Sequence, residues 1–226
     1  MKLLRAVLST FALFLGLLMQ EVQAQDVLTL SDGSMLEYYV VTPRNSAANA
    51  WPLAIFMGGG AGDKPISYTA FRYYAVELSR QGWAVAVPVS PDNRSFRGGN
   101  IAKVRELIAA LQARDDVLDG KTLIGGISAG GMSALEIARR YPEEFLGVMG
   151  VPAIMDNSRG FESLKGMPVY LRIGTEDELG WADRFDATVE NLKAVGTVLD
   201  AELVEGGPHM FGIDFELVKP WLDGLR

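Results

Sequence analysis

A single serine lies in the middle of the segment TLIGGISAGGMSALEIA, which spans residues 122–138. An apolar run typical of a buried strand precedes Ser128, and a run with helical spacing follows it. Gly126 and Gly130 flank it two residues away on either side, which completes the pattern G-x-S-x-G. A very tight strand-to-helix turn strains the backbone at its centre, and small neighbours leave the chain room to pass. The pattern therefore predicts that Ser128 presents its hydroxyl as a nucleophile.

A nucleophilic serine needs a general base, and the chain contains one histidine, His209. This residue lies in the segment EGGPHMF, directly after the last predicted strand. Where a serine occupies such a turn, an acidic residue and then a histidine follow it along the chain. Imidazole suits the task because it takes a proton near neutral pH and returns it to the leaving group. We therefore predict that His209 activates Ser128.

The acid is expected after the preceding strand, in the segment YLRIGTEDELGW. Three consecutive acids stand there, namely Glu176, Asp177 and Glu178. We predict that Asp177 fixes the imidazole tautomer and stabilises the imidazolium without taking the proton itself. Glu176 is the next choice, and a merely solvated acidic loop is a further interpretation that the sequence leaves open.

Two backbone N–H groups are needed to stabilise the charge that develops on a substrate carbonyl oxygen. We expect one from Ala129, at the start of the predicted helix, where the helix dipole assists. The segment FMGGGAGD is expected to supply the other from Gly59 or Gly58, because glycines let the backbone turn its amides towards a substrate. Neither glycine-rich segment completes G-x-G-x-x-G, and no G-K-[ST] is present, which argues against a phosphate cradle. A helix N-cap at Ser128 and an accidental pattern stay as alternatives.

The elements that must position these residues follow from the hydrophobic pattern. Two β-type runs flank a turn at Asp32 and Gly33, which predicts an antiparallel hairpin. Further strands are predicted at residues 51–57, 83–90, 121–127, 145–151, 167–174 and 200–206, and helices at 68–82, 100–114, 129–140, 182–195 and from about 214. Near-continuous apolar runs between helices predict an α/β fold with a mostly parallel, eight-stranded sheet covered on both faces. Ligands bind beyond the carboxyl ends of the strands in such sheets.

The chain resembles the α/β-hydrolases in the segments GISAGGM, IGTED and GGPH taken together. It is similar to compact bacterial serine esterases of the dienelactone hydrolase, phospholipase/carboxylesterase and polyhydroxybutyrate-depolymerase-like branches, over nearly all of residues 25–226. The resemblance implies an α/β-hydrolase fold and ester hydrolysis through an acyl-enzyme intermediate, with no metal and no cofactor. One departure is Met57, because many lipases and esterases of this fold carry histidine before the glycines.

The connection at residues 152–166 is too short for a multi-helix cap, so we predict a minimal lid or none. An open site favours short or exposed ester substrates. The residues expected to line an apolar acyl pocket, although such side chains are more often plain core, are Met57, Met132, Trp181, Met210 and Phe211. Two arginines after the fourth strand, Arg94 and Arg97, could meet an anionic or polar group, although such arginines are more often solvated.

Composition limits the other function classes. The formal charge of −7 comes with no basic stripe, which argues against a nucleic-acid partner. The chain has no cysteine, which excludes disulfides, a thiolate nucleophile and a lipid-modified cysteine, and its one histidine leaves no nitrogen–sulfur metal site to propose. A serine peptidase of the same fold and a non-catalytic binding protein stay as alternatives. The oligomeric state is not predicted.

The first 24 residues have the pattern of a secretory signal peptide. Two basic residues precede an apolar run at residues 6–19, and Val22 and Ala24 occupy the small-residue positions before a cleavage site. The run is shorter than the ~20 residues that a membrane-spanning helix needs, so a stable membrane anchor is not expected. We expect export to the periplasm or the medium, with residues 25–226 forming one α/β-hydrolase domain.

Overall fold

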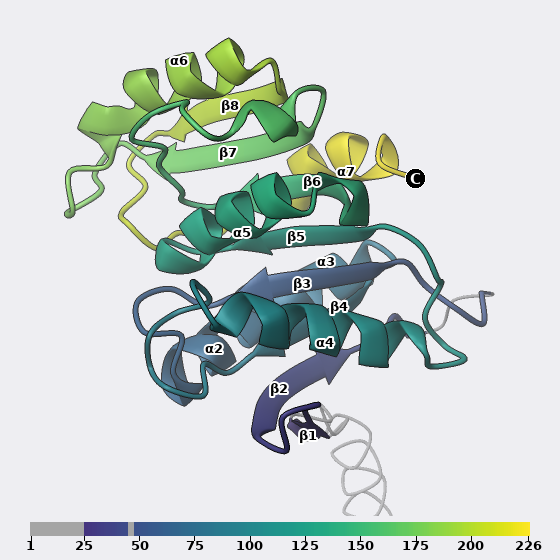
Figure 1. Cartoon of the computed structure of the whole chain (residues 1–226). Helices are drawn as coiled ribbons and strands as arrows, with labels where there is room; N and C mark the ends of the chain where they lie inside the picture. Colours follow the sequence, from purple (N-terminus) through teal and green to yellow (C-terminus); the bar gives the residue numbers. More distant parts are fainter. Residues whose placement is uncertain (1–24, 45–47) are drawn as a thin grey trace, which may run out of the picture.

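One twisted sheet dominates the computed structural model, which describes residues 25–44 and 48–226 (Figure 1). The predicted signal peptide lies outside the described residues. The strands are β1 Asp26–Thr29, β2 Met35–Val41, β3 Leu53–Met57, β4 Ala84–Pro88, β5 Thr122–Gly126, β6 Phe145–Gly150, β7 Pro168–Gly174 and β8 Val198–Val204. Their order across the sheet is β1-β2-β4-β3-β5-β6-β7-β8, which confirms the predicted count of eight.

The sheet is antiparallel at one edge and parallel elsewhere. β1 and β2 form the predicted hairpin, with Asp26 opposite Tyr38, and β2 runs antiparallel to β4. All neighbours from β4 to β8 are parallel, so the carboxyl ends of β3, β5 and β7 lie at one edge, at the left in Figure 1. The hairpin turn uses Gly33 at a φ of +83°, where glycine is favoured, and the Asp32 carboxylate accepts the Ser34 N–H at 2.8 Å.

Helices cover both faces, as the apolar strands predicted. The helices α4 Asn100–Gln112, α5 Ala129–Arg140 and α6 Phe185–Val195 cover one face, and α2 Lys64–Ala70, α3 Val76–Arg80 and α7 Phe215–Asp223 cover the other (Figure 1). The core is accordingly divided into two clusters, one on each side of the sheet. Every residue of β3, β4 and β5 is buried, because these central strands pack against helices on both sides.

The helix predicted at residues 68–82 differs most from the observed element. It begins at Lys64, because the Asp63 side chain accepts the Ile66 N–H as an N-cap and Pro65 lies in the first turn. A π-helical turn at Phe71–Ala75 separates α2 from α3. The prediction started at the first residue with helical apolar spacing and so missed the capped, more polar first turn.

No helical cap lies between β6 and β7. That connection contains one short 3₁₀ turn, Glu162–Leu164, so the predicted minimal lid agrees with the fold.

The helices of the protein can also be compared with the length and apolar character of a membrane-spanning helix. Within residues 25–44 and 48–226, no helix has both the length and the apolar character needed to cross a membrane.

Candidate active site

Ser128 occupies the junction between β5 and α5 with the backbone that the glycine pattern predicts. Its φ of 55° and ψ of −120° are costly for a residue with a side chain, by about 1–3 kcal/mol. Hydrogen bonds hold the turn: the Ser128 N–H donates to the Pro152 carbonyl at 2.8 Å, and its own carbonyl accepts the Met132 N–H at 2.9 Å. The side chain makes no capping hydrogen bond, which removes the N-cap interpretation of this serine.

Glycine is required at positions 126 and 130 because the end of β3 passes too close to both for a side chain. A Cβ atom on Gly126 would lie 2.6 Å from the Met57 carbonyl oxygen, and one on Gly130 would lie 2.3 Å from the same atom. Real Cβ atoms do not approach backbone oxygen so closely, so any side chain at either position would push β3 and α5 apart. The Ile127 N–H donates to this same carbonyl at 3.0 Å.

Of the two expected oxyanion donors in the glycine-rich loop, Gly59 lies against Ser128. A Cβ on Gly59 would be 3.2 Å from the Ser128 Cβ, whereas one on Gly58 would meet Ile66 and Ser67. The N–H groups of Gly59 and Ala129 donate no hydrogen bond to another described residue. Both amides are therefore available to a ligand.

Asp177 and His209 form a buried pair beyond β7 and β8. The Asp177 Oδ2 lies 2.7 Å from the His209 Nδ1, and each residue is 7% exposed. The other carboxylate oxygen, Oδ1, accepts the backbone N–H of Leu179 at 2.8 Å and lies 3.5 Å from the backbone nitrogen of Trp181. The Trp181 ring meets the imidazole edge-on, with 4.9 Å between ring centroids. These contacts fix both the carboxylate and the plane of the imidazole.

The structure separates the three consecutive acids. Asp177 faces the imidazole, while Glu178 is exposed and its Oε2 accepts the backbone N–H of His209 at 2.9 Å. That hydrogen bond holds the pKa of Glu178 below its ordinary value. Glu176 is exposed, and its backbone N–H donates to the Gly207 carbonyl. Glu176, the alternative acid, therefore makes no contact with the imidazole among the described residues.

Backbone contacts join the loop of the acid to the loop of the histidine. A Cβ on Gly174 would lie only 2.0 Å from the Gly207 carbonyl oxygen, so the end of β7 and the histidine loop touch directly. The Thr175 N–H donates to the Val204 carbonyl, and the Thr175 Oγ1 accepts the Gly206 N–H at 2.8 Å. The position of His209 therefore depends on β7 as much as on its own strand.

The Nε2 atom of His209 is buried and has no hydrogen-bond partner among the described residues, the Ser128 hydroxyl included. Ser128 follows β5 and Asp177 follows β7, with β6 between them. Because neighbouring strands are about 4.8 Å apart, β5 and β7 are separated by roughly 10 Å. The serine turn and the acid loop thus lie at the same edge of the sheet, on either side of β6.

The expected pocket-lining residues have different surroundings. Met57 is fully buried in the core cluster under α4 and α5, so its side chain packs with the core in this structure. Phe211 is also buried, and Trp181 packs on the imidazole. Met132 is partly buried at the edge of a pocket, and Met210 is 45% exposed. Met132, Trp181 and Met210 are therefore the expected lining residues that keep some exposure to solvent.

One residue that the sequence did not single out is Tyr74, in the π-helical turn. Its side chain is buried and stacks on Phe56, and its hydroxyl donates to the Phe211 carbonyl at 2.5 Å. Burial raises the pKa of Tyr74 to about 12. The contact ties the chain just after His209 to the helices that cover the α7 face of the sheet. No local signal marks it, because the partners are 137 residues apart.

The sheet order, the strained serine turn and the buried carboxylate–imidazole pair define the fold as that of an α/β-hydrolase. Residues 66–211 match the Esterase family model, described as "Putative esterase", and the chain belongs to that family.

Curated relatives match part of the chain. The "Probable thioesterase BOA10" of Botryotinia fuckeliana is 38% identical over 92 residues, which are 40% of this chain and 31% of that protein. "Esterase YjfP" of Escherichia coli is 29% identical over 128 residues, which are 50% of this chain and 49% of that protein. The chain thus spans at most about half the length of these relatives.

Solved structures extend the likeness of fold. Esterase 2 of Thermogutta terrifontis, in its apo form, is 16% identical, with a TM-score of 0.64 over 91% of this chain and 94% of that chain. The same esterase has been solved phosphorylated by paraoxon, with a TM-score of 0.63 and 16% identity over 90% of this chain and 94% of that chain. Est1E of Butyrivibrio proteoclasticus is 17% identical, with a TM-score of 0.63 over 89% of this chain and 98% of that chain.

Replacing Tyr74 with phenylalanine should lower the free energy of unfolding by about 1–2 kcal/mol at pH 8, because the Phe211 carbonyl loses its donor. Tyr74 ionises near pH 10 in the unfolded chain and near 12 in the folded one, so its contribution is complete below pH 10 and is lost as the pH rises towards 12. The difference in free energy of unfolding between Tyr74→Phe and the parent protein should therefore be smaller at pH 11 than at pH 8. Urea denaturation of both proteins at pH 8 and at pH 11 measures this difference.

The matched control is Tyr73→Phe, since Tyr73 is 67% exposed beside it. This change should leave the free energy of unfolding within about 0.5 kcal/mol of the parent protein. Equal stability of the two variants at pH 8 would show that the Tyr74 hydroxyl does not hold the histidine loop.

Proposed function

We propose that the protein is a serine hydrolase that cleaves carboxylic esters of small molecules through an acyl-enzyme intermediate. The observation that carries this proposal is the Nε2 of His209, buried without a partner on an imidazole held by Asp177. A buried nitrogen left unpaired costs free energy unless a ligand or a moving group uses it. Ser128, in a strained turn at the same edge of the sheet, is the group that we assign to it. Membership of the Esterase family supports an ester as the substrate.

The first half of the reaction forms the acyl-enzyme. The Ser128 Oγ attacks the ester carbonyl carbon while the His209 Nε2 takes the hydroxyl proton. The oxygen of the tetrahedral intermediate carries the negative charge and accepts hydrogen bonds from the N–H groups of Gly59 and Ala129. The intermediate collapses, the bond to the alcohol oxygen breaks, and Nε2 gives its proton to the departing alcohol.

The second half releases the acid. A water molecule attacks the acyl carbon, and the His209 Nε2 takes one of its protons. The new tetrahedral intermediate breaks the bond to Ser128, whose oxygen recovers the proton from Nε2. The products are one alcohol and one carboxylic acid, and the protein returns to its starting state.

Asp177 determines which imidazole nitrogen is free. Its carboxylate accepts a hydrogen bond from Nδ1, so the neutral imidazole carries its proton there and Nε2 is left with a lone pair. The same carboxylate stabilises the imidazolium when Nε2 is protonated. Its two backbone donors, the N–H groups of Leu179 and Trp181, keep it oriented for this purpose.

The replacement Ser128→Ala should lower kcat/KM for 4-nitrophenyl acetate by at least about 1,000-fold, because the nucleophile is lost. A fluorophosphonate should label the parent protein once, at Ser128, and should leave the variant unlabelled. Ser133→Ala is the matched control, since Ser133 lies further along the same helix with its hydroxyl bound to the Ala129 carbonyl. Undiminished turnover by folded Ser128→Ala would reject the proposal.

The replacement Asp177→Asn should lower kcat by about 10³–10⁴-fold with little change in KM, because the imidazole loses its orienting charge. Glu176→Gln, one residue earlier in the same loop, should keep kcat within about threefold of the parent protein. Steady-state kinetics on one neutral ester compares the two variants. The reverse order of effects would assign the acid to Glu176 instead.

We also propose export from the cytoplasm, on the strength of the sequence of the first 24 residues. Expression in a Gram-negative host should place the protein in the periplasm or the medium, with Gln25 as its first residue by terminal sequencing. Ala24→Arg should block cleavage because the position before the cut requires a small residue, whereas Gln23→Arg should not. Cytoplasmic protein that retains Met1 would contradict the proposal.

A further inference from the structure

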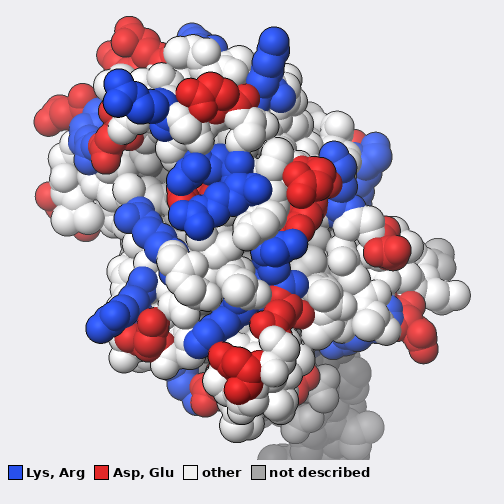
Figure 2. Space-filling model, in the orientation of Figure 1, with Lys and Arg blue, Asp and Glu red and all other residues white. Residues whose placement is uncertain are grey.

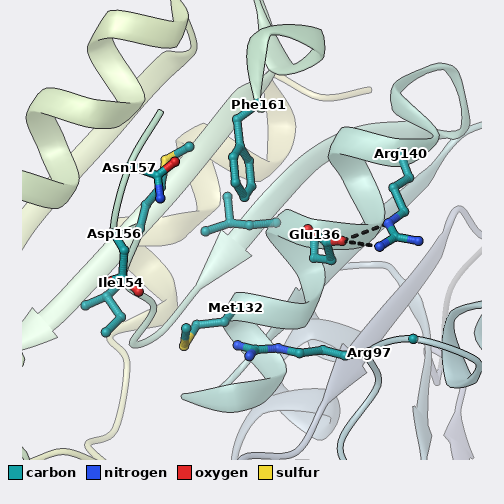
Figure 3. Close-up of a pocket in the computed structure, with 11 residues that line it drawn as sticks. Arg97, Met132, Glu136, Arg140, Ile154, Asp156, Asn157 and Phe161 are labelled. Carbon is teal, nitrogen blue, oxygen red and sulfur yellow. Dashed lines mark hydrogen bonds and ion pairs between the residues drawn. The ribbon is translucent and has the colours of Figure 1, made fainter. Parts of the chain in front are cut away.

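A pocket of about 290 Å³ lies on the outer side of α5, on the face of the sheet that α4 and α6 also cover (Figure 3). Three segments line it. They are the loop after β4, one side of α5 from Met132 to Arg140 and the connection after β6. None of the steps described above uses these side chains.

The pocket adjoins Ser128 through the two segments that hold the serine turn. Met132 lines it, and its N–H bonds the Ser128 carbonyl, so the lining begins about 6 Å along the helix from the serine. Pro152, whose carbonyl accepts the Ser128 N–H, lies two residues before Ile154 in the opposite wall. The pocket therefore begins about one helical turn from Ser128, close enough for one substrate to reach both.

Most charged side chains around the pocket have partners. The Glu136 carboxylate binds Arg140 at 2.7 Å and also binds Arg139. Asp156 pairs with Arg184. The Arg97 guanidinium makes no ion pair or hydrogen bond with another described residue. Arg97 is thus the uncompensated charge of the lining.

Apart from the ion-paired side chains of Glu136, Arg140 and Asp156, the polar side chains of the pocket are donors and the other side chains are apolar. Figure 3 shows the Arg97 side chain extended across the pocket with its guanidinium beside Met132. The Asn157 Oδ1 accepts the Arg159 N–H at 3.2 Å, which leaves its amide NH₂ as a donor. Ile154 and Phe161 supply apolar surface. This combination suits a ligand with an apolar body and an anionic end.

The charge of the surrounding face agrees with an anionic ligand. The whole chain carries a formal charge of −7. Basic side chains nevertheless lie near the centre of the face that α4, α5 and α6 cover, with acidic side chains beside them (Figure 2). A local positive field attracts anions and raises their rate of encounter even when the net charge has the opposite sign.

We propose that this pocket is a substrate subsite for a carboxylate and that Arg97 determines specificity for esters that carry one. The inference rests on the proposed ester hydrolysis at Ser128 and names its substrate class. The ester carbonyl lies at Ser128, while a carbon chain or ring contacts Met132 and Phe161. The carboxylate at its far end binds the Arg97 guanidinium. The carboxylate belongs either to the acyl part or to the alcohol part of the ester.

Two matched pairs of esters test the proposal. Mono-4-nitrophenyl adipate against 4-nitrophenyl hexanoate places the charge on the acyl side, and 4-acetoxybenzoate against 4-acetoxybenzamide places it on the alcohol side. Arg97→Gln should lower kcat/KM for the charged member of one pair by about 10-fold or more and should change the neutral members less than twofold. The pair that responds identifies the side of the ester that the pocket accepts.

Arg94→Gln is the control, because Arg94 is exposed in the same loop but does not line the pocket. It should leave all four esters within twofold of the parent protein. An equal effect of Arg97→Gln on charged and neutral esters, or no effect on either charged ester, would overturn the proposal while leaving ester hydrolysis intact.

A binding measurement separates the failure of this inference from the failure of the proposed function. Adipate binding to the Ser128→Ala variant, followed by calorimetry, needs no turnover. It should weaken at least about fivefold when Arg97→Gln is added and should weaken at higher salt. Neutral-ester turnover without adipate binding overturns the subsite alone, whereas adipate binding that depends on Arg97 without turnover of any ester overturns the esterase proposal alone.

Discussion

The carbonyl oxygen of Met57 passes so close to the first turn of α5 that residues 126 and 130 have no room for a Cβ atom. This contact brings the end of β3, the end of β5 and the start of α5 to one point, and it leaves Ser128 in a strained backbone conformation. The same approach carries Gly59 against the serine. The geometry on which the proposed chemistry depends is therefore set by backbone packing at the centre of the sheet.

The histidine side of the site has a different kind of support. Its loop is long, and it is held by contacts from three directions, namely the Asp177 carboxylate, the Glu178 carboxylate and the Tyr74 hydroxyl. The first two come from the neighbouring loop, and the third comes from the π-helical turn between α2 and α3. The two halves are thus supported independently, and the strand order places their loops on either side of β6 at one edge of the sheet.

Short-range patterns were enough to predict the elements nearest the serine. Helix α5 begins at Ala129 and ends at Arg140 as predicted, because the glycine turn marks its start. The burial of Met57 in the core could not be predicted, because an apolar residue at the end of a central strand looks the same in sequence whether it faces substrate or core. Glu176 and Asp177 were hard to separate because adjacent acids in a loop carry no periodic signal, and only the folded loop directs one of them at the imidazole.

The start of α2 and the role of Tyr74 were missed for related reasons. The first turn of α2 is polar, so apolar spacing did not reveal it, although Asp63 followed by Pro65 was a readable helix-start signal. Tyr74 meets its partner only through the tertiary fold, and pairing of this kind cannot be inferred from one sequence. The position of Arg97 beside the pocket is another such case, since its surroundings come from α5 and from the segment after β6.

The short connection between β6 and β7 forms a wall of the pocket, yet it supplies none of the groups proposed to act on the ester bond. Surface connections tolerate insertions and substitutions better than the strands and helices they join. Evolution, or an engineer, can accordingly exchange the part of this stretch beyond Pro152, whose carbonyl holds the Ser128 turn, to retune which molecules are accepted while the reacting groups stay as they are. In this architecture, selectivity and reactivity are separable traits.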